Sequence, residues 1–328
     1  MARLFAIVSS LVCLLLAGPA AAQDKYPSKP VKILVPFGAG SATDIVIRIV
    51  AEQMRIILGQ PFVIDNKPGA FGILAVEEMA RAKPDGYTLE AGNVGTNAVT
   101  PVLYRKKMTI DYEKDVVPIA RLSDVPLILI ASTKDFPPKS VAELVAYAKQ
   151  NPGKVRFASV GVGSNNHYDM EMFARRVGVQ MVHIPIKAGG AGMTNDLVTG
   201  DVHIGLVNAA SAGGQIKAGT LRPLAIASDQ RLAEYPDVPT MAEAGYPGVG
   251  SQLWAGLFAP ARTPPDVLET LQQAVAQALD SAPVQEAFKK QNIRAVPTRS
   301  LADAKAWLGD EMAKWNKIVS EVKIELTD

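Results

Sequence analysis

Strand-like and helix-like segments alternate along almost the whole chain, and this alternation limits the folds that it can adopt. Short apolar, β-branched runs predict strands, and windows with helical periodicity separate most of them. In the window 44–58 the apolar residues fall on one helical stripe, and Gly59 follows as a stop. The expected strands cover residues 31–35, 62–65, 87–92, 125–132, 155–160, 181–186, 202–207, 221–228, 253–260 and 293–297. Alternation on this scale predicts an α/β fold with mostly parallel sheets.

The length of the chain predicts two domains. Of the 328 residues, 306 remain after the N-terminal signal described below, and one hydrophobic core rarely organises so many. Residues 124–132 have the pattern of one continuous apolar strand, along which the chain can cross between domains. Residues 229–251 are rich in proline, glycine and charge and form the expected connector for the return. We therefore predict one lobe from 24–124 and 252–328 and a second lobe from 125–228.

The first residues have the composition of a secretory signal peptide. Arg3 supplies a positive charge, residues 4–18 are an apolar run without a charged side chain, and residues 20–22 are small alanines. We predict cleavage after Ala22, which assigns residues 1–22 to the signal. The apolar run is shorter than the roughly 20 residues that a membrane span needs. The mature protein is therefore expected to be exported and soluble.

Composition excludes several functional classes. The only cysteine, Cys13, lies in the predicted signal, so the mature chain would have neither a disulfide nor a thiolate nucleophile. Removing Arg3 leaves 33 basic side chains against 32 acidic ones. This near balance argues against a nucleic-acid partner, which usually requires a concentrated basic face. The basic cluster 105–107 is followed at once by acidic residues, and we interpret it as a solvated loop.

Four glycine-rich turns each follow a predicted strand and precede a helical window. They are PFGAGSATD at 36–44, KPGAFG at 67–72, VGVGSNNH at 160–167 and KAGGAG at 187–192, two in each predicted lobe. Such a unit points unpaired backbone N–H groups outward at the carboxyl edge of a sheet, where the helix dipole adds partial positive charge. Ligands of open α/β sheets bind at that edge. The turns therefore predict a site for a phosphate, sulfate or carboxylate.

Several turns must converge to give useful affinity. One helix terminus contributes about 0.3–1 kcal/mol toward an anion, and up to about 2 kcal/mol when it is partly buried. A micromolar complex needs roughly 8 kcal/mol. We therefore expect turns of both lobes to meet around one ligand. The alternative is that these are ordinary strand–helix turns, in which glycine and serine are common anyway.

Other nucleotide and catalytic interpretations have little support. Gly38 and Gly40 begin the dinucleotide pattern G-x-G-x-x-G, but its third position is Thr43, and an exported protein has little access to NAD. A P-loop is excluded because no Lys-Ser or Lys-Thr follows a suitable glycine spacing. Ser164 does not lie in the G-x-S-x-G sequence of a hydrolase.

The three histidines do not predict a metal site, and we expect no cofactor. None of His167, His183 and His203 has the i, i+4 spacing of a metal-binding helix, and no cysteine can assist them. His183 and His203 lie in apolar predicted strands and are interpreted as hydrogen-bonded structural residues. His167 falls in the first turn of a predicted helix, where a pocket role and a local capping role both remain open.

Taken together, these motifs resemble the Bug family, the periplasmic substrate-binding proteins of tripartite tricarboxylate transporters. The resemblance extends from Tyr26 to the final helix with Trp315, which is essentially the whole mature chain. It is carried by the stretches at 36–44, 66–70 (NKPGA), 83–89 (KPDGYTL), 158–167, 183–185 (HIP), 236–240 (PDVPT), 242–245 (AEAG) and 254–260 (WAGLFAP). Each stretch is weak alone, but their order and spacing are specific.

The resemblance implies a two-lobed type II periplasmic-binding fold with two crossovers, which closes on a small carboxylate and has no catalytic residues. It further implies delivery of the ligand to membrane transporter subunits. Carried over by position, the implied ligand-binding residues are Phe37, Gly40, Ser41, Thr43, Asp44, Thr96, Asn97, Ser159, Ser164, Asn165, His167, Lys187, Gly189, Gly190 and Asn208. Asp44 is better suited to cap its helix than to contact an anion, although it could meet the ammonium group of an amino acid.

Four positions depart from the pattern that the family implies. Ala39-Gly40-Ser41 replaces Pro-Gly-Gly, Phe71 replaces a second glycine, His203 replaces an aspartate, and Lys187 follows Ile186 rather than a tyrosine. These changes fall in or near the implied cleft, so the ligand should not be copied from a relative. We include Phe71 in the predicted site, where it would pack against an aromatic or long aliphatic ligand.

The sequence thus predicts a non-catalytic periplasmic solute-binding protein for a di- or tricarboxylate, an aromatic carboxylate or a related organic acid. We expect a monomer. The alternative is a secreted enzyme that acts on a small carboxylate in the same cleft, which the lack of a recognisable nucleophile–base pair disfavours. A sensory module that feeds a receptor is a third possibility.

Overall fold

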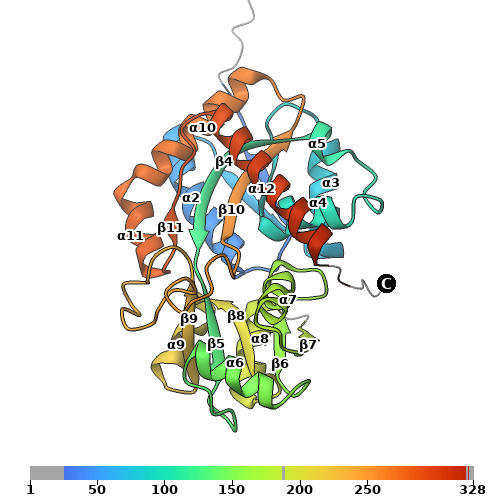
Figure 1. The fold of residues 1–328 in the computed structure, drawn as a ribbon. Helices are drawn as coiled ribbons and strands as arrows, with labels where there is room; N and C mark the ends of the chain where they lie inside the picture. The colour runs from blue at the N-terminus through green and yellow to red at the C-terminus, as the bar shows by residue number, and fades with distance from the viewer. Residues whose placement is uncertain (1–25, 187–188, 323, 325–328) are drawn as a thin grey trace, which may run out of the picture.

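Two sheets, one in each lobe, organise the chain (Figure 1). The computed structural model describes residues 26–186, 189–322 and 324. The strands of the first sheet are β1 (Val31–Val35), β2 (Phe62–Asn66), β3 (Thr88–Asn93), β4 (Val116–Val125), β10 (Leu253–Pro260) and β11 (Arg294–Ala295), in the order β11-β4-β10-β3-β1-β2. Those of the second are β5 (Leu127–Ser132), β6 (Arg156–Ser159), β7 (Val182–Pro185), β8 (Ile204–Asn208) and β9 (Leu221–Ala227), in the order β7-β6-β8-β5-β9.

Helices cover both faces of each sheet. One face of the first sheet packs against α2 (Ala42–Leu58), α10 (Pro265–Asp280) and α11 (Ala282–Lys290). Its other face packs against α3 (Ile73–Arg81), α4 (Thr100–Leu103), α5 (Tyr112–Asp115) and α12 (Leu301–Glu321), with the short η1 (Ala70–Gly72) and the π-helix η2 (Gly95–Val99) nearby. The second sheet lies between α6 (Val141–Gln150) with α7 (Asn165–Val177) and α8 (Gly189–Thr199) with α9 (Ala209–Lys217). The predicted two-lobed α/β fold is confirmed.

The chain passes from the first sheet to the second through one residue. β4 ends at Val125, Pro126 follows, and β5 begins at Leu127 in the other sheet. The prediction of one continuous strand over 124–132 is therefore wrong, and the strand β4 was missed. Proline has no N–H to donate to a ladder, so the pairing of β4 ends before it. The return runs through residues 228–252 to β10. The lobe limits given above remain a prediction.

The crossovers determine the direction of every strand. β1 to β4 run in one direction, with their carboxyl ends at the crossover edge, and β6 to β9 do the same in the second sheet. β5 and β10 arrive from the other lobe, so they run away from that edge and pair antiparallel with their neighbours. The expectation of mostly parallel sheets is therefore wrong, because five of the nine pairings are antiparallel.

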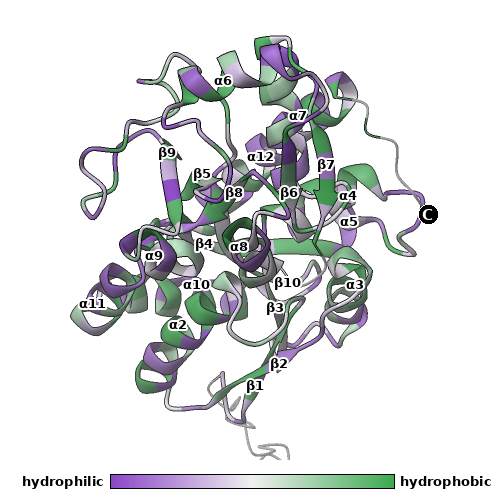
Figure 2. Ribbon diagram, turned by 90° about the horizontal axis from the view of Figure 1, so that it is seen from below, coloured by the Kyte–Doolittle hydropathy of each residue, from purple (hydrophilic) through white to green (hydrophobic). Residues whose placement is uncertain are grey.

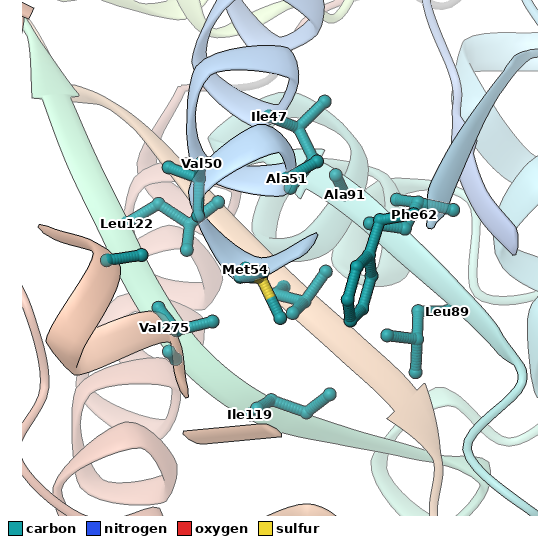
Figure 3. Close-up of a cluster of buried hydrophobic side chains, with 14 of the residues drawn as sticks. Ile47, Val50, Ala51, Met54, Phe62, Leu89, Ala91, Ile119, Leu122 and Val275 are labelled. Atoms are coloured by element: carbon teal, nitrogen blue, oxygen red, sulfur yellow. The ribbon is translucent and has the colours of Figure 1, made fainter. Parts of the chain in front are cut away.

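Alternation along the strands builds two apolar layers in each lobe. In β1, Val31, Ile33 and Val35 face the α2 side, whereas Leu34 faces the α3 side. The α2 side is completed by apolar residues of several elements, among them Met54 of α2 (Figure 3). Strands β1 and β10 are mostly hydrophobic in Figure 2, whereas the surrounding helices alternate between hydrophobic and hydrophilic residues. This is the pattern of sheets that are covered on both faces.

Serine side chains begin several helices. Ser140 accepts a hydrogen bond from the Glu143 N–H at 3.1 Å, and Ser300 accepts one from Asp303 at 3.0 Å. The Thr240–Glu243 pair forms both bonds of a capping box, a pattern typical of a helix start, yet residues 241–245 are a turn. Pro247 follows too soon for a helix to continue, so the cap closes a turn instead.

Helix α7 joins the lobes at a second place. The Tyr168 ring meets the Trp315 ring of α12 edge to face, with centroids 6.0 Å apart. The Arg175 guanidinium donates to the Glu321 carbonyl at 3.1 Å. In the part of the chain that the structure describes, no helix is both long and apolar enough to span a bilayer.

We expect Met54→Ala to lower the free energy of unfolding by about 2–5 kcal/mol, because Met54 is fully buried and its loss leaves a cavity. Ile56→Ala, two residues along the same helix, is the matched control. Ile56 is 59% exposed, so its replacement should change the stability by less than about 0.5 kcal/mol. Urea unfolding of the two variants measures the difference, and equal losses would contradict the assignment of this helix face to the core.

Candidate functional site

The carboxyl ends of six parallel strands lie on either side of the crossovers. β1, β2 and β3 end there in the first lobe, and β6, β7 and β8 end there in the second. Leu127, the first residue of β5, pairs with Asn208 at the end of β8, and only Pro126 separates it from β4. The two edges therefore face each other. The turns at 36–41, 67–72 and 160–164 follow these strand ends, as predicted.

Turns of the two lobes approach each other directly at Phe71. A methyl group added to Gly161 would lie 3.6 Å from the Phe71 ring. The ring is 50% exposed and stacks on Tyr104 with centroids 4.9 Å apart. The backbone of Phe71 is left-handed, with φ 55°, and its carbonyl accepts from the Thr100 hydroxyl at 3.0 Å. An aromatic side chain thus extends from the first lobe toward the turn of the second.

Asp44 organises the first turn from inside. It is 2% exposed, and its Oδ2 accepts from the Gly40 N–H and from Arg48 Nε, both at 2.9 Å. Its Oδ1 accepts from Asn66 Nδ2 at 2.9 Å, and the same amide donates to the Phe37 carbonyl at 3.0 Å. Burial alone would raise the pKa of Asp44, but the hydrogen bonds from Arg48, Gly40 and Asn66 outweigh it and lower the pKa. The carboxylate is ionised and holds the turn closed.

Donors remain available at the start of α2. Ser41 accepts from the Asp44 N–H at 3.3 Å, and Thr43 Oγ1 accepts from Asn93 Nδ2 at 3.1 Å. Among the described residues, neither hydroxyl hydrogen has an acceptor, and neither do the N–H groups of Ala42 and Thr43. These are the orphan donors of a helix N-terminus. They agree with the predicted role of Ser41 and Thr43 toward an anion.

Thr96 and Asn97 lie behind the turns in η2. Thr96 is 2% exposed and lies so close to Gly72 that a side chain there would overlap its methyl group. Its Oγ1 accepts from the Asn93 N–H at 3.0 Å and donates to Asn97 Oδ1 at 2.5 Å. Asn97 is fully buried and donates to Glu90 Oε2 at 2.9 Å. Thr96 therefore packs beneath the turn at 67–72, and Asn97 links this segment to the sheet through Glu90.

A stacked pair of neutral histidines shapes the facing turn. The His167 and His183 rings are 3.5 Å apart at 14°. His167 Nδ1 accepts from the Gly163 N–H at 3.1 Å, and His183 Nε2 lies 2.7 Å from Ser159 Oγ. Burial, and secondarily His183, lowers the pKa of His167 to about 3, and burial lowers the pKa of His183 to about 4. His183 is hydrogen-bonded as expected of a structural residue, and His167 makes a local hydrogen bond, while its role in the pocket stays a prediction.

The Ser159–His183 contact brings together a hydroxyl and a base that the sequence did not pair. Ser159 is fully buried, and its hydroxyl also lies 2.8 Å from the Gly161 carbonyl and accepts from the Gly161 N–H. Ser164 donates to the same carbonyl at 2.7 Å. Both serines therefore use their hydroxyl groups to stabilise the conformation of the turn at 160–164. His203 is likewise structural, because its Nδ1 accepts from the Arg156 N–H at 3.0 Å.

The remaining predicted residues of the second lobe divide into two groups. Asn165 donates to Ser251 in the return connector at 3.1 Å, which places it at the junction of the lobes. Asn208 begins α9, where its Oδ1 accepts from the Ser211 N–H at 2.9 Å, and its Nδ2 faces Gly190. Helix α8 begins at Gly189, so this turn is already helical. Lys187 lies outside the described residues.

The structure adds residues that the sequence analysis did not select. Asn66 and Asn93 are the last residues of β2 and β3, and their amides tie the first turn to the sheet. Their position at strand ends was the signal that could have found them. Phe37, in contrast, packs its ring against the core, so only its backbone faces the turn.

Other candidate sites lie elsewhere. A groove of about 510 Å³ flanks the crossovers and is lined partly by Asp124, Pro126, Lys289 and Arg294. None of the predicted ligand-binding residues lines it. Among the described residues, no group of three or more histidine, aspartate or glutamate side chains is arranged to hold a metal ion.

Known proteins match the chain over most of its length. The family model described as "Tripartite tricarboxylate transporter family receptor" matches residues 46–324. Protein BugT of Bordetella pertussis is 34% identical over 328 residues, which cover 99% of both chains. The structure of Rpa4515 of R. palustris with adipate has a TM-score of 0.83 at 32% identity, covering 91% of this chain and 99% of that one. MatC of Rhodopseudomonas palustris with bound malate has a TM-score of 0.79 at 33% identity, covering 90% and 100%.

We expect Asp44→Asn to lower the free energy of unfolding by about 1–3 kcal/mol at pH 7, because an amide cannot accept all three hydrogen bonds. The Asp44 pKa is lowered by folding, so its contribution is present above about pH 4 and is lost as the pH falls through the folded value. The difference in the free energy of unfolding between wild type and Asp44→Asn should therefore shrink as the pH falls below about 4. Glu52→Gln, which removes an exposed pair on the same helix, should have little effect. Urea unfolding as a function of pH tests this, and a constant difference would contradict it.

Proposed function

This chain belongs to the tripartite tricarboxylate transporter receptor family of non-catalytic periplasmic binding proteins, and from that premise we propose that it captures a small carboxylate between its lobes. We propose further that it delivers this ligand to the membrane subunits of a tripartite tricarboxylate transporter. Export would depend on the signal at residues 1–22, which lie outside the described residues. The protein would act as a monomer.

One observation carries the proposal: free donors of two helices lie at facing sheet edges. α2 presents the N–H groups of Ala42 and Thr43, and α7 presents those of Asn165 and Asn166, none with an acceptor among the described residues. Each helix terminus contributes only about 0.3–1 kcal/mol toward an anion. Hydrogen bonds to a charged group add roughly 1.5–3 kcal/mol each. Together these contributions support micromolar binding of a carboxylate.

The arrangement favours a ligand with two acidic ends. One carboxylate would meet the α2 turn and the Ser41 and Thr43 hydroxyls, and the other would meet the α7 and Asn208 side. Adipate in the Rpa4515 structure and malate in the MatC structure are both dicarboxylates, which supports this class for a similar chain. The histidines of the second turn are neutral, so binding would rely on hydrogen bonds rather than on their charge.

Lobe closure would complete the site. The crossover at Pro126 and the return segment 228–252 are the two covalent connections about which the described lobes could rotate. Phe71 stands where the turns already approach, so it would cover the ligand in the closed state. Closure would expel water and strengthen each hydrogen bond to the carboxylates. The transporter would then recognise the closed pair of lobes.

We expect malate or adipate to raise the melting temperature of the wild-type protein in a saturable way without being consumed. Ser41→Gly should weaken binding about tenfold, because the hydroxyl donor is lost, whereas glycine is tolerated as a helix cap within a few tenths of a kcal/mol. Ser320→Ala, at an exposed site on α12, should bind like the wild type. Thermal-shift assays and calorimetry measure both effects. Product formation would instead support an enzyme.

Phe71→Gly should distinguish long ligands from short ones. The residue has a left-handed backbone, which suits glycine, so the relief of strain offsets the loss of stacking on Tyr104 and the variant should fold like the wild type. If the ring covers the ligand, adipate should lose more affinity than malate, by about tenfold for the loss of one aromatic contact. Calorimetric titration with both acids measures the ratio, and wild-type binding of adipate by the variant would count against this role.

A further inference from the structure

An acidic residue lies where the sheet requires an apolar one. Glu90 is in the middle of β3, between Leu34 of β1 and Phe258 of β10, and both neighbours belong to the apolar layer on the α3 side. Its side chain is fully buried. A glycine at position 92 makes room for it, because a side chain there would overlap the Glu90 and Asn97 polar atoms. Burying a carboxyl group in an apolar layer costs free energy unless hydrogen bonds compensate for the lost water.

The carboxyl of Glu90 has one partner and is neutral at pH 7. Oε2 accepts from Asn97 Nδ2 at 2.9 Å, while Oε1 has no hydrogen-bond partner among the described residues. Burial raises the pKa of Glu90 to about 8, against the smaller lowering effect of the Asn97 bond. The Tyr112 hydroxyl of α5 is also buried without a partner in the described part of the chain. Its pKa is raised by burial and by Glu90, so it stays neutral as well.

Hydrogen bonds, two of them from backbone N–H groups, connect Glu90 to the first turn through residues 93–97. Because Asn97 donates its amide to Glu90, its Oδ1 is left to accept from the Thr96 hydroxyl at 2.5 Å. Thr96 Oγ1 in turn accepts from the Asn93 N–H at 3.0 Å. Asn93 Oδ1 accepts from the Gly95 N–H at 2.9 Å, which leaves its amide to donate to Thr43 Oγ1 at 3.1 Å. Because Thr43 Oγ1 accepts this bond from Asn93, its hydroxyl hydrogen remains available to donate to a ligand.

We propose that Glu90 is a positioning residue of the ligand site: as a buried hydrogen-bond acceptor it fixes Asn97 and Thr96, and through Asn93 it positions the Thr43 hydroxyl toward the bound carboxylate. This inference rests on the function proposed above. The segment that it fixes is the π-helix η2, a conformation found frequently at functional sites. Glu90 itself does not touch the ligand.

The proposal makes carboxylate binding sensitive to alkaline pH. Ionisation of Glu90 above about pH 8 would place a buried negative charge behind a site for an anion, so affinity falls as the pH rises. Two helices that flank this face of the sheet present apolar residues and one hydrogen-bonded acid. The buried residues of α3 are Ala75, Val76 and Met79, and Glu311 of α12 is bound to Trp254 at 2.8 Å. The two histidines of the facing turn are neutral throughout this range.

Glu90→Gln is the main test, because it keeps the size and an acceptor oxygen but cannot ionise. Between pH 7 and pH 9, wild-type affinity for malate or adipate should fall by about three- to tenfold, one tenfold step corresponding to one unit of pKa shift. The Gln variant should bind with a nearly constant affinity. Glu269→Gln, at an exposed position of α10 on the opposite face of the sheet, should keep the wild-type profile. Equal pH profiles for wild type and Glu90→Gln overturn the proposal.

Hydrogen exchange of the Asn93, Gly95 and Thr96 amides supplies a readout that needs no ligand. At pH 7, Glu90→Leu should lower the exchange protection of these amides at least about tenfold, because leucine removes the acceptor for Asn97. Glu90→Gln keeps an acceptor oxygen and should retain the protection. Unchanged protection in Glu90→Leu overturns the positioning role. If neither acid binds the wild type but protection behaves as expected, the proposed ligand class fails while the Glu90 network stands.

Discussion

A single residue, Pro126, connects β4 of one sheet to β5 of the other. It leaves no slack between the carboxyl edge of one sheet and that of the other. Strands that return from the opposite lobe must then run away from this edge, which makes both sheets mixed. The turns that follow β1, β2, β6 and β8 are brought face to face for the same reason. The site is therefore a consequence of chain topology before any side chain contributes to it.

Buried polar groups give the turns their shape. Asp44 binds the first turn through its ionised carboxylate, Glu90 supports η2 as a neutral acid, and the His167–His183 stack holds the second turn as neutral bases. Each of these groups uses its hydrogen bonds within the protein. The donors left for a ligand are backbone N–H groups and hydroxyls. Such a site is preorganised, and a carboxylate that enters it replaces water without requiring the protein to rearrange its charges.

The same organisation explains why a buried serine–histidine contact does not indicate catalysis. Ser159 and His183 lie 2.7 Å apart, yet the serine is fully buried and bonded to Gly161 within its own turn. Membership in a family of binding proteins agrees with this arrangement. The aromatic ring of Phe71 extends from the first lobe toward Gly161 of the second. In the proposed function, this ring is the contact that would discriminate between ligands.

Local periodicity and turn chemistry in the sequence were enough to predict the α/β class and the glycine-rich turns that follow the strands. The sequence alone did not determine β4, the mixed sheets or the supporting roles of Asn66, Asn93 and Glu90. Those depend on which strands become neighbours and on which polar groups meet in the interior, and residues far apart in the chain decide both. Glu90 shows the difference: in the sequence it is one acid in a strand, and only burial beside Asn97 makes it a neutral support for the turn.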